Sequence, residues 1–286
     1  MVKLDAKYVK SFVRSVLEED IGEGDITTKN IIPPTHRIVA KIVAGESGII
    51  SGLPVAREVF KTLDKKCVWR AKFSDGDFVK KGQTVAVVKG LARAILTSER
   101  TVLNFLSHMS GIATLTKKFI KKMKKSNIKI LDTRKTLPGL RLFEKYAVMC
   151  GGGCNNRLRL DEMVLIKDNH IKTCRKLGLP IEQVVKSLNT KIPHDTEIEF
   201  EAQNMYEVML ALNSNVDIIM LDNMSYKRIK KAIKLIRQKN KNIQIEISGN
   251  INLKNIEKLS RLDVNRISIG SITHSAPALD FSLEIE

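Results

Sequence analysis

Residues 217–250 read DIIMLDNMSYKRIKKAIKLIRQKNKNIQIEISGN and contain one complete repeat of the predicted architecture. Its two ends, 217–221 and 243–247, are short runs rich in β-branched residues, as expected of buried strands. The segment between them, 226–237, has the apolar spacing of an amphipathic helix with a basic outer face. A strand, a helix and a second strand in this order form the unit from which parallel sheets are built.

The same alternation runs through the chain from about residue 127 onward. Strand-like runs recur at 128–131, 163–166, 197–200, 217–221, 243–247 and 266–269, and helical segments such as 205–212 and 253–259 lie between several of them. Six strands alternating with helices favour an α/β barrel, either complete or incomplete. An open, doubly wound sheet is the alternative that this pattern leaves open.

The first hundred residues have a different pattern. Residues 5–19 and 92–109 are predicted to be helical, and short alternating runs at 38–43, 48–51 and 69–73 predict the strands of a small sheet. The pattern is typical of a half-barrel or of the corner of a sandwich. The chain therefore contains two regions of different architecture.

The composition is that of a folded, globular protein. Of the 286 residues, 43% are hydrophobic and 28% are charged, which is enough to bury a sizeable core. The chain lacks an apolar run of about 18 residues, and its start resembles a charged amphipathic helix rather than a signal peptide. We therefore expect a cytoplasmic protein that does not contact membranes. Its four cysteines lack paired CxxC spacing, so we expect neither a zinc site nor disulfides.

The formal net charge of +18 has two interpretations. Nucleic-acid binding is the obvious one. However, much of the excess is lysine scattered as on solvated helix faces, and the aromatic residues, 5% of the chain, are not interleaved with the basic runs. A basic enzyme that acts on polyanionic small molecules fits the same charge, and we expect no nucleic-acid partner.

Polar or small residues follow the strands of the predicted barrel. The carboxyl ends of barrel strands meet at one mouth, where active sites of this fold are built. Three cations are expected at this mouth, Arg134, Lys135 and Lys167, together with two carboxylates, Glu201 and Asp222. The last two strands are followed by turns of small residues, which are Ser248, Gly249, Asn250, Gly270 and Ser271. The turns predict a phosphate site and the cations predict a ligand with carboxylates. The two acids predict a site for Mg²⁺ on a pyrophosphate, or for ribose hydroxyls.

Long motifs carry a resemblance that runs from about residue 10 to the C-terminus. They are EDIGEGDITT (19–28), SERTVLNF (98–105), DTRKTLPGLRLFEKYAV (132–148), the glycines 151–153, LIKDNHI (165–171), IMLDN (219–223), EISGN (246–250) and SIGSITHS (268–275). In this order and over this length, they resemble the quinolinate phosphoribosyltransferase family.

The resemblance implies an incomplete α/β barrel with an N-terminal α/β sandwich domain. The sandwich would comprise 1–112, with 274–286 returning to it, and the catalytic barrel would comprise 113–273. The implied reaction transfers phosphoribose from phosphoribosyl pyrophosphate to quinolinate with decarboxylation, giving nicotinate mononucleotide, pyrophosphate and CO₂ in NAD biosynthesis. Mg²⁺ is the implied cofactor. The resemblance also implies a homodimer or higher oligomer with shared active sites.

The resemblance also implies roles for individual residues. The quinolinate site would contain Arg134, Lys135, Arg157 and Lys167, with Arg100 arriving from the neighbouring subunit. Thr133 and Asn156 would also bind substrate. Glu201 and Asp222 would serve the ribose and the metal-bound pyrophosphate. The 5-phosphate would bind to Ser248, Gly249, Asn250, Gly270 and Ser271. Catalytic roles would fall to Lys135, Glu201 and Asp222.

One departure from the family pattern follows the glycines 151–153. The family usually has a histidine where this chain has Asn156, and that histidine helps to hold a substrate carboxylate. An asparagine amide donates a hydrogen bond but carries no charge, and Arg159 is a candidate for supplying the missing cation. Asn156 therefore leaves open a phosphoribosyltransferase of the same fold for another aromatic acid. The net charge of +18 leaves open a second alternative, a non-catalytic binder of phosphosugar or nucleic acid.

Overall fold

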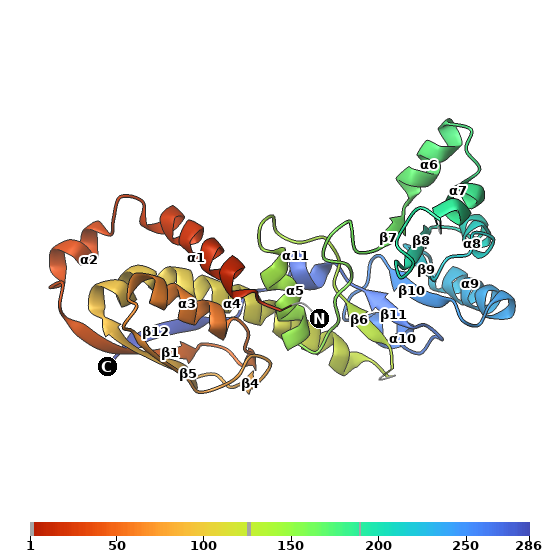
Figure 1. Cartoon of the computed structure of the whole chain (residues 1–286). Coiled ribbons are helices and arrows are strands. Elements are labelled where there is room, and N and C mark those ends of the chain that lie inside the picture. Colours follow the sequence, from red (N-terminus) through yellow and green to blue (C-terminus); the bar gives the residue numbers. More distant parts are fainter. Residues whose placement is uncertain (1–2, 125–126, 189) are drawn as a thin grey trace. The chain divides into compact units, whose positions relative to one another are not determined.

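The computed structural model describes residues 3–124, 127–188 and 190–286 (Figure 1). The chain divides into two compact units. The first comprises Met1–Lys117, Thr136–Gly153 and Ile272–Glu286, and the second comprises Lys118–Lys135 and Cys154–Ser271. Within the described residues, no helix has the length and apolar character needed to cross a lipid bilayer.

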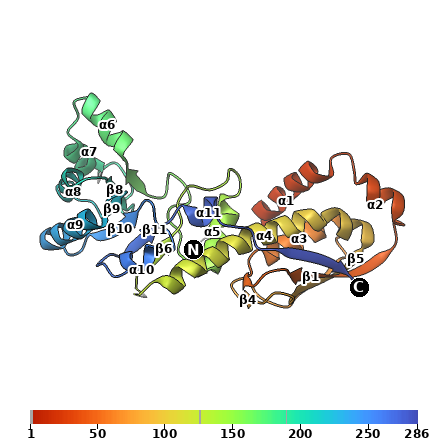
Figure 2. The ribbon, with the colours of Figure 1, turned by 180° about the vertical axis from the view of Figure 1, so that it is seen from behind.

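The first unit is built on a four-stranded antiparallel sheet. The strand order is β12–β1–β5–β3, with β1 (Arg37–Ala44), β3 (Val68–Ala71), β5 (Thr84–Leu91) and β12 (Phe281–Ile285). The end of the chain therefore completes a sheet that begins near its start, and Figure 2 shows this blue C-terminal strand at the sheet. A second, small sheet pairs β2 (Gly48–Ile49) with β4 (Phe78–Val79).

The helices of the first unit are α1 (Ala6–Ile21), α2 (Ile26–Ile31), α3 (Leu53–Leu63), α5 (Arg141–Cys150) and most of α4 (Ala92–Lys122). The sequence predicted that the last of these ends near residue 109. It continues because Ile112 and Ala113 extend its buried face. Gly111 does not interrupt it: a Cβ there would lie 2.2 Å from the carbonyl oxygen of Pro277, so glycine permits this close approach.

The second unit is a six-stranded parallel sheet, which confirms the predicted incomplete barrel. The strands are β6 (Lys129–Leu131), β7 (Val164–Ile166), β8 (Ile198–Ala202), β9 (Ile218–Asp222), β10 (Gln244–Ser248) and β11 (Arg266–Ser268), in the order β6–β11–β10–β9–β8–β7. The last strand returns to pair with the first, as in a barrel and unlike the doubly wound order. The described residues form no hydrogen-bonded pair between β6 and β7, so the barrel is open there.

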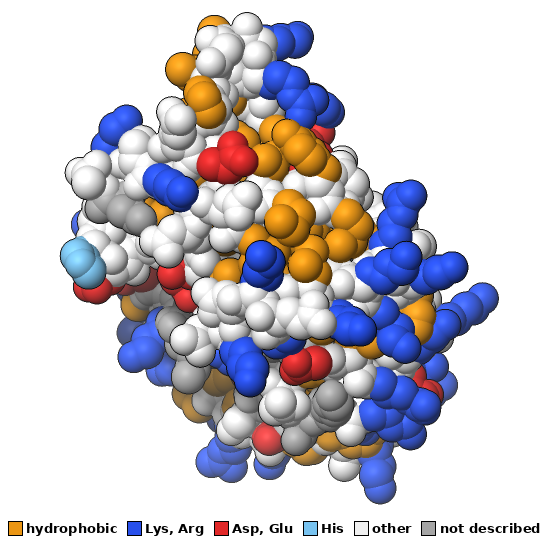
Figure 3. Space-filling view, turned by 90° about the vertical axis from the view of Figure 1, so that its right-hand side faces the viewer, with side chains coloured by type: hydrophobic (Ala, Val, Ile, Leu, Met, Phe, Trp, Pro, Cys, Tyr) orange, Lys and Arg blue, Asp and Glu red, His pale blue; other side chains and the backbone are white. Residues whose placement is uncertain are grey.

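Helices connect the strands of the barrel: α6 (Asp168–Lys176), α7 (Ile181–Leu188), α8 (Met205–Leu212), α9 (Tyr226–Lys239) and α10 (Ile256–Leu259), with α11 (Ser271–His274) after the last strand. In Figure 1, α8 and α9 lie beside the strands β8–β10. Helix α9 buries Ile229, Ala232 and Ile236 and exposes its lysines, as the amphipathic pattern predicted. Figure 3 shows that Lys and Arg greatly outnumber Asp and Glu on the face that it views.

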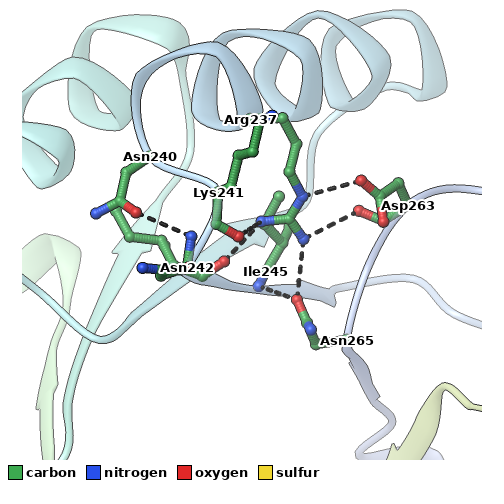
Figure 4. Close-up of polar contacts among 8 residues, drawn as sticks. Arg237, Asn240, Lys241, Asn242, Ile245, Asp263 and Asn265 are labelled. Atoms are coloured by element: carbon green, nitrogen blue, oxygen red, sulfur yellow. Dashed lines mark hydrogen bonds and ion pairs between the residues drawn. The ribbon is translucent and has the colours of Figure 1, made fainter.

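Arg237 fastens the C-terminal end of α9 to the base of the barrel, the end at which the strands begin (Figure 4). Its Nε donates to Asp263 at 2.9 Å, Nη1 to the carbonyl oxygen of Ile243 at 2.7 Å, and Nη2 to Asn265 Oδ1 at 3.1 Å. The same Asn265 oxygen accepts the backbone N–H of Ile245 at 2.8 Å. Arg237 is therefore a structural arginine, at the end of the barrel where residues serve stability.

Candidate active site

A cavity of about 340 Å³ lies at the carboxyl ends of the barrel strands. All six strands or the residues directly after them contribute to its wall, which consists of Thr133, Arg134, Lys135, Asn156, Arg157, Leu165, Lys167, Glu201, Met220, Asp222, Asn223, Ser248 and Ser268. Most of the site residues predicted from the sequence are among them. The strand ends therefore converge as the barrel geometry requires.

The remaining predicted site residues lie elsewhere. Gly249 and Asn250 line a neighbouring cavity of about 230 Å³ beside α9 and α10. Gly270 and Ser271 follow β11 directly. Arg100 is exposed on α4 in the first unit, and its assignment to a neighbouring subunit stays a prediction.

Asp132 anchors the segment that brings Asn156 and Arg157 to the cavity. This carboxylate is fully buried at the end of β6, where it accepts the backbone N–H of Asn156 at 2.9 Å and the side-chain amide of Asn155 at 2.6 Å. Cys154 forms a parallel bridge with Leu131 on β6. The segment after the glycines thus lies along β6, on the side where the barrel is open.

Arg157 is half-buried and is crowded by another cation. Its Nη1 donates to the carbonyl oxygen of Met163 at 2.8 Å. Burial lowers the pKa of Arg157, and the positive charge of Arg134 lowers it further, while Glu199 acts in the opposite direction. The charges of the two guanidinium groups repel each other, so an anion with two carboxylates would relieve the repulsion. This part of the wall is suited to a dicarboxylate.

Lys167 enters the cavity from the start of α6. It is the N-terminal cap residue of this helix, and its backbone N–H donates to His170 Nδ1 at 3.0 Å. His170 therefore fixes the turn that carries Lys167. Lys135 adds a further cation at the end of β6, where its backbone N–H donates to Thr133 Oγ1 at 3.0 Å. With Arg134 and Arg157, these lysines make the wall beside β6 and β7 cationic.

Two carboxylates, Glu201 and Asp222, stand at the ends of the neighbouring strands β8 and β9. Burial raises the pKa of Glu201, and the nearby negative charge of Asp222 raises it further. The lysines 167 and 135 act against this shift. Asp222 accepts the side-chain amide of Asn223 at 2.7 Å. The wall thus changes sign from the β6–β7 side to the β8–β9 side.

The turn after β10 has a backbone that requires glycine. Gly249 has a φ of +86°, and a Cβ there would lie 2.2 Å from Asn223 Oδ1. Asn250, at a φ of +54°, donates its side-chain amide to the same oxygen at 3.0 Å. The turns after β9 and β10 therefore pack directly on each other. Residues with a left-handed backbone conformation in such turns expose their backbone N–H groups, as in the concave sites that bind anions.

The cavity is also lined by three residues that the sequence did not predict: Leu165, Met220 and Ser268. Leu165 and Met220 lie two residues before the predicted site residues Lys167 and Asp222, and Ser268 lies two residues before Gly270. Side chains two apart on a strand face the same side. The alternation along each strand was the signal that could have found them. Asn223, which directly follows Asp222 at the predicted mouth of the barrel, also lines the cavity.

Arg159 does not replace the missing histidine as suggested. Its side chain is 67% exposed and forms ion pairs with Asp161 at 3.2 Å and Glu162 at 3.7 Å. Asn156 itself lines the cavity, and its side-chain oxygen accepts the backbone N–H of Arg157 at 2.6 Å. The position that departs from the family pattern is therefore part of the site, whereas Arg159 is occupied by acidic neighbours.

Comparison with known proteins decides the family. Residues 25–110 match the N-terminal domain of quinolinate phosphoribosyl transferases, and residues 112–284 match their C-terminal domain. The chain belongs to the quinolinate phosphoribosyltransferase family. The second match ends at residue 284, so it includes most of β12, the strand that returns to the first sheet.

Individual members of the quinolinate phosphoribosyltransferase family match over nearly the whole chain. A probable nicotinate-nucleotide pyrophosphorylase (carboxylating) of Synechocystis is 39% identical over 277 residues, which cover 97% of this chain and 92% of the relative. Quinolinate phosphoribosyltransferase (decarboxylating) 1 of Nicotiana glauca is 37% identical, with 97% and 82% covered. The crystal structure of NadC from Streptococcus pyogenes matches with a TM-score of 0.92 and 36% identity, covering 100% of this chain and 99% of that one.

Proposed function

We propose that this protein transfers the phosphoribosyl group of phosphoribosyl pyrophosphate to quinolinate and removes CO₂, giving nicotinate mononucleotide and pyrophosphate for NAD biosynthesis. The relatives are named for this activity. The observation that carries the proposal is the change of charge around the cavity, from cations beside β6 and β7 to carboxylates at β8 and β9. This order suits a dianionic acid at one end and a sugar carrying a metal-bound pyrophosphate at the other.

The cationic wall would bind quinolinate. Its two adjacent carboxylates match a pair of guanidinium groups that are crowded together, because each carboxylate can accept two hydrogen bonds from an arginine. Arg134 and Arg157 would hold these carboxylates, with Lys135, Lys167 and the amide of Asn156 beside them. The ring nitrogen would then point toward the acidic part of the cavity.

The carboxylates Glu201 and Asp222 would serve the ribose and the metal-bound pyrophosphate. No group of three or more His, Cys, Asp or Glu in the described part of the chain is placed to hold a metal ion. Two neighbouring carboxylates fit Mg²⁺ nevertheless, because this ion is commonly held by one or two carboxylates together with substrate phosphates. When bound, Mg²⁺ would neutralise charge on the departing pyrophosphate. The 5-phosphate would bind at Ser248, Gly249, Asn250, Gly270 and Ser271.

The reaction proceeds by displacement and then decarboxylation. The quinolinate nitrogen forms a bond to C1 of the ribose as the bond from C1 to pyrophosphate breaks. The positive charge that develops on the ribose favours nearby carboxylates, so Glu201 and Asp222 would stabilise it. The bond from ring carbon 2 to its carboxylate then breaks, and the electron pair stays on that carbon beside the positively charged nitrogen. Addition of a proton completes nicotinate mononucleotide.

Two finer parts of the proposal concern assembly and location. We propose a homodimer, or a higher oligomer, in which Arg100 of one subunit reaches the site of its neighbour. Mixing inactive Arg100→Ala chains with inactive Lys135→Ala chains should then restore activity, because one site of the mixed dimer is intact. Verified subunit exchange without recovered activity would contradict a shared site.

A cytoplasmic location stays a prediction.

The substrate assignment is tested by comparing two acids. The purified protein, with phosphoribosyl pyrophosphate and Mg²⁺, should consume quinolinate but not nicotinate. Nicotinate lacks the second carboxylate, which both the cationic wall and the decarboxylation require. Equal use of nicotinate would contradict the decarboxylating assignment. Loss of turnover on adding a chelator, with recovery on adding Mg²⁺, is the expected result for the metal.

A further inference from the structure

Helix α6 begins with a residue that cannot cap it. Lys167 is the N-cap residue, with an extended backbone (φ −116°, ψ 167°), and it lines the cavity. N-cap residues usually carry a side-chain oxygen that accepts a backbone N–H of the first turn. A lysine side chain has donors but no acceptor. The lysine therefore serves the cavity rather than the helix, and other groups have to stabilise the start of α6.

His170 provides this stabilisation. It is the third residue of α6, and its Nδ1 accepts the backbone N–H of Lys167 at 3.0 Å. A hydrogen bond from the N-cap N–H to the third helical side chain is one half of a capping box, in which glutamate or glutamine is usual. The carbonyl oxygen of Lys167 accepts the backbone N–H of Ile171 at 3.1 Å. Both backbone groups of Lys167 are thus bonded within the first turn.

Packing contributes little to the position of this turn. All nine residues of α6 are described, and of these Ile171 alone is buried. Figure 1 shows α6 extending away from the strands of the barrel. The preceding strand, β7, pairs with β8 on one side and, within the described residues, with no strand on the other. Because elements with few buried contacts are easily displaced, the hydrogen bond to His170 is important for the position of Lys167.

The contact requires a neutral imidazole. Nδ1 accepts a hydrogen bond only while it carries no proton, so the proton of the neutral ring lies on Nε2. A second proton would make Nδ1 a donor that faces the N–H of Lys167, and the hydrogen bond would be lost. The N-terminal end of the helix dipole also disfavours a cation in this turn.

The charged groups around His170 do not contact its ring. Those on the first half of α6, and on α7, the helix packed against it, are Lys167, Asp168, Lys172, Glu182 and Lys186. Asp168 forms an ion pair with Lys172 at 2.7 Å, and β7 contributes no charged residue. Among the described residues, the ring makes one hydrogen bond, the one from Lys167. The helix start therefore depends on the ring in its neutral form.

We propose that His170 is a positioning residue for quinolinate, whose neutral ring holds the turn that carries Lys167 into the cavity. This inference rests on the proposed function, in that Lys167 is taken to bind a carboxylate of quinolinate. The affinity for quinolinate then falls as His170 becomes protonated, and histidine ordinarily changes charge between pH 5 and 8. The added charge would itself attract a dianion, but His170 is exposed, so solvent and salt screen this attraction.

Isothermal titration of the full chain with quinolinate at pH 8 and at pH 6 tests the inference. His170→Gln keeps an acceptor at this position but does not titrate, whereas His170→Ala has no acceptor. At pH 8, His170→Gln should bind as the wild type does, and His170→Ala should bind about three- to tenfold more weakly. At pH 6 the wild type should approach the affinity of His170→Ala, while His170→Gln should lose less. Protonation of quinolinate itself affects all variants alike.

His194→Gln is the matched control. It removes another exposed histidine from the same unit and should keep both the affinity and the pH dependence of the wild type. Steady-state kinetics at pH 8 gives a second readout. His170→Ala should raise the quinolinate KM by the factor seen in binding and leave kcat and the KM for phosphoribosyl pyrophosphate near those of the wild type. A general loss of structure would change all three.

Several outcomes would overturn the inference. They are an unchanged affinity of His170→Ala at pH 8, a His170→Gln protein as weak as His170→Ala, and an equal loss of affinity in the wild type and His170→Gln between pH 8 and pH 6. A wild type that gains affinity at pH 6 relative to His170→Gln would do so too. In each case quinolinate still binds, so the proposed function is unaffected. A chain that binds quinolinate at neither pH would overturn the proposed function, and the inference with it.

Discussion

The base and the mouth of the barrel both use arginine, but in different surroundings. At the base, the guanidinium of Arg237 donates to Asp263, to Asn265 and to the carbonyl of Ile243 (Figure 4). At the mouth, Arg157 is crowded by Arg134, and burial together with this neighbour lowers its pKa. An arginine whose donors are taken up by protein acceptors stabilises the fold, whereas an arginine beside a second positive charge favours binding of an anion. The surroundings of a cation therefore indicate its role better than its residue type.

The largest expected effect comes from an acid at the mouth. Asp222→Asn should lower kcat by about a hundredfold, because it removes a charge that faces the developing positive charge and the metal-bound pyrophosphate. Steady-state kinetics with varied phosphoribosyl pyrophosphate measures this loss. Asp263→Asn is the matched control at the base, where the acid pairs with Arg237. If both substitutions reduce kcat equally, the division between mouth and base is wrong.

The next effect concerns the cationic wall. Arg157→Ala should raise the quinolinate KM about ten- to a hundredfold, because loss of a charge-assisted hydrogen bond costs roughly 1.5–3 kcal/mol. The KM for phosphoribosyl pyrophosphate should change little. Arg159→Ala, two residues away, removes a cation that is exposed and paired with Asp161, so both KM values should stay near those of the wild type. A silent Arg157→Ala would remove this residue from the site.

At the base, a substitution should affect stability rather than catalysis. Arg237→Ala should lower the free energy of unfolding by roughly 1–3 kcal/mol, because it leaves the carbonyl oxygen of the buried Ile243 without its donor and removes the contacts with Asp263 and Asn265. Denaturant unfolding measures this change, and kcat/KM of the folded protein should be unaltered. Lys234→Ala, an exposed position on the same helix, is the control. A large change of KM in Arg237→Ala would show that the base also shapes the site.

The dependence of kcat/KM on pH should reflect the ionisation of Glu201 at the mouth of the barrel. Glu201 has to be ionised to serve the ribose, and its pKa is raised by burial and by Asp222. As the pH falls, Glu201 therefore becomes protonated earlier than an ordinary glutamate, whose pKa is about 4.3. The acid limb of kcat/KM for phosphoribosyl pyrophosphate should lie above that value. In Asp222→Asn the residual activity should have its acid limb at lower pH, and an unchanged limb would contradict this coupling.

The smallest effect is expected at Asn156. Asn156→His should change the quinolinate KM by less than about tenfold. The new ring would join a wall that already carries Arg134, Arg157 and two lysines, whose charges disfavour a further cation. Steady-state kinetics on this variant measures the change. A gain of a hundredfold would mean that the natural chain is specialised for another aromatic acid.

The sequence predicted all six barrel strands to within two residues, because buried parallel strands need nearly continuous apolar runs. The helix expected over 253–259 is shorter, since Asn252 and Asn255 bond locally to the backbone and delay its start to Ile256. The rim of the cavity was predictable because strand ends converge in a barrel. The anchoring of the segment 154–157 by Asp132 was not, because this contact joins elements that sequence periodicity does not relate.

The fate of the 2-carboxyl carbon of quinolinate distinguishes the proposed decarboxylating transfer from other reactions at this site. The acid is labelled with ¹³C at this carboxyl group and incubated with the purified protein, phosphoribosyl pyrophosphate and Mg²⁺. We predict that labelled CO₂ and pyrophosphate appear in equal amounts and that the nucleotide formed carries no label. Pyrophosphate release with the label retained in the nucleotide, or CO₂ release without pyrophosphate, would contradict the account.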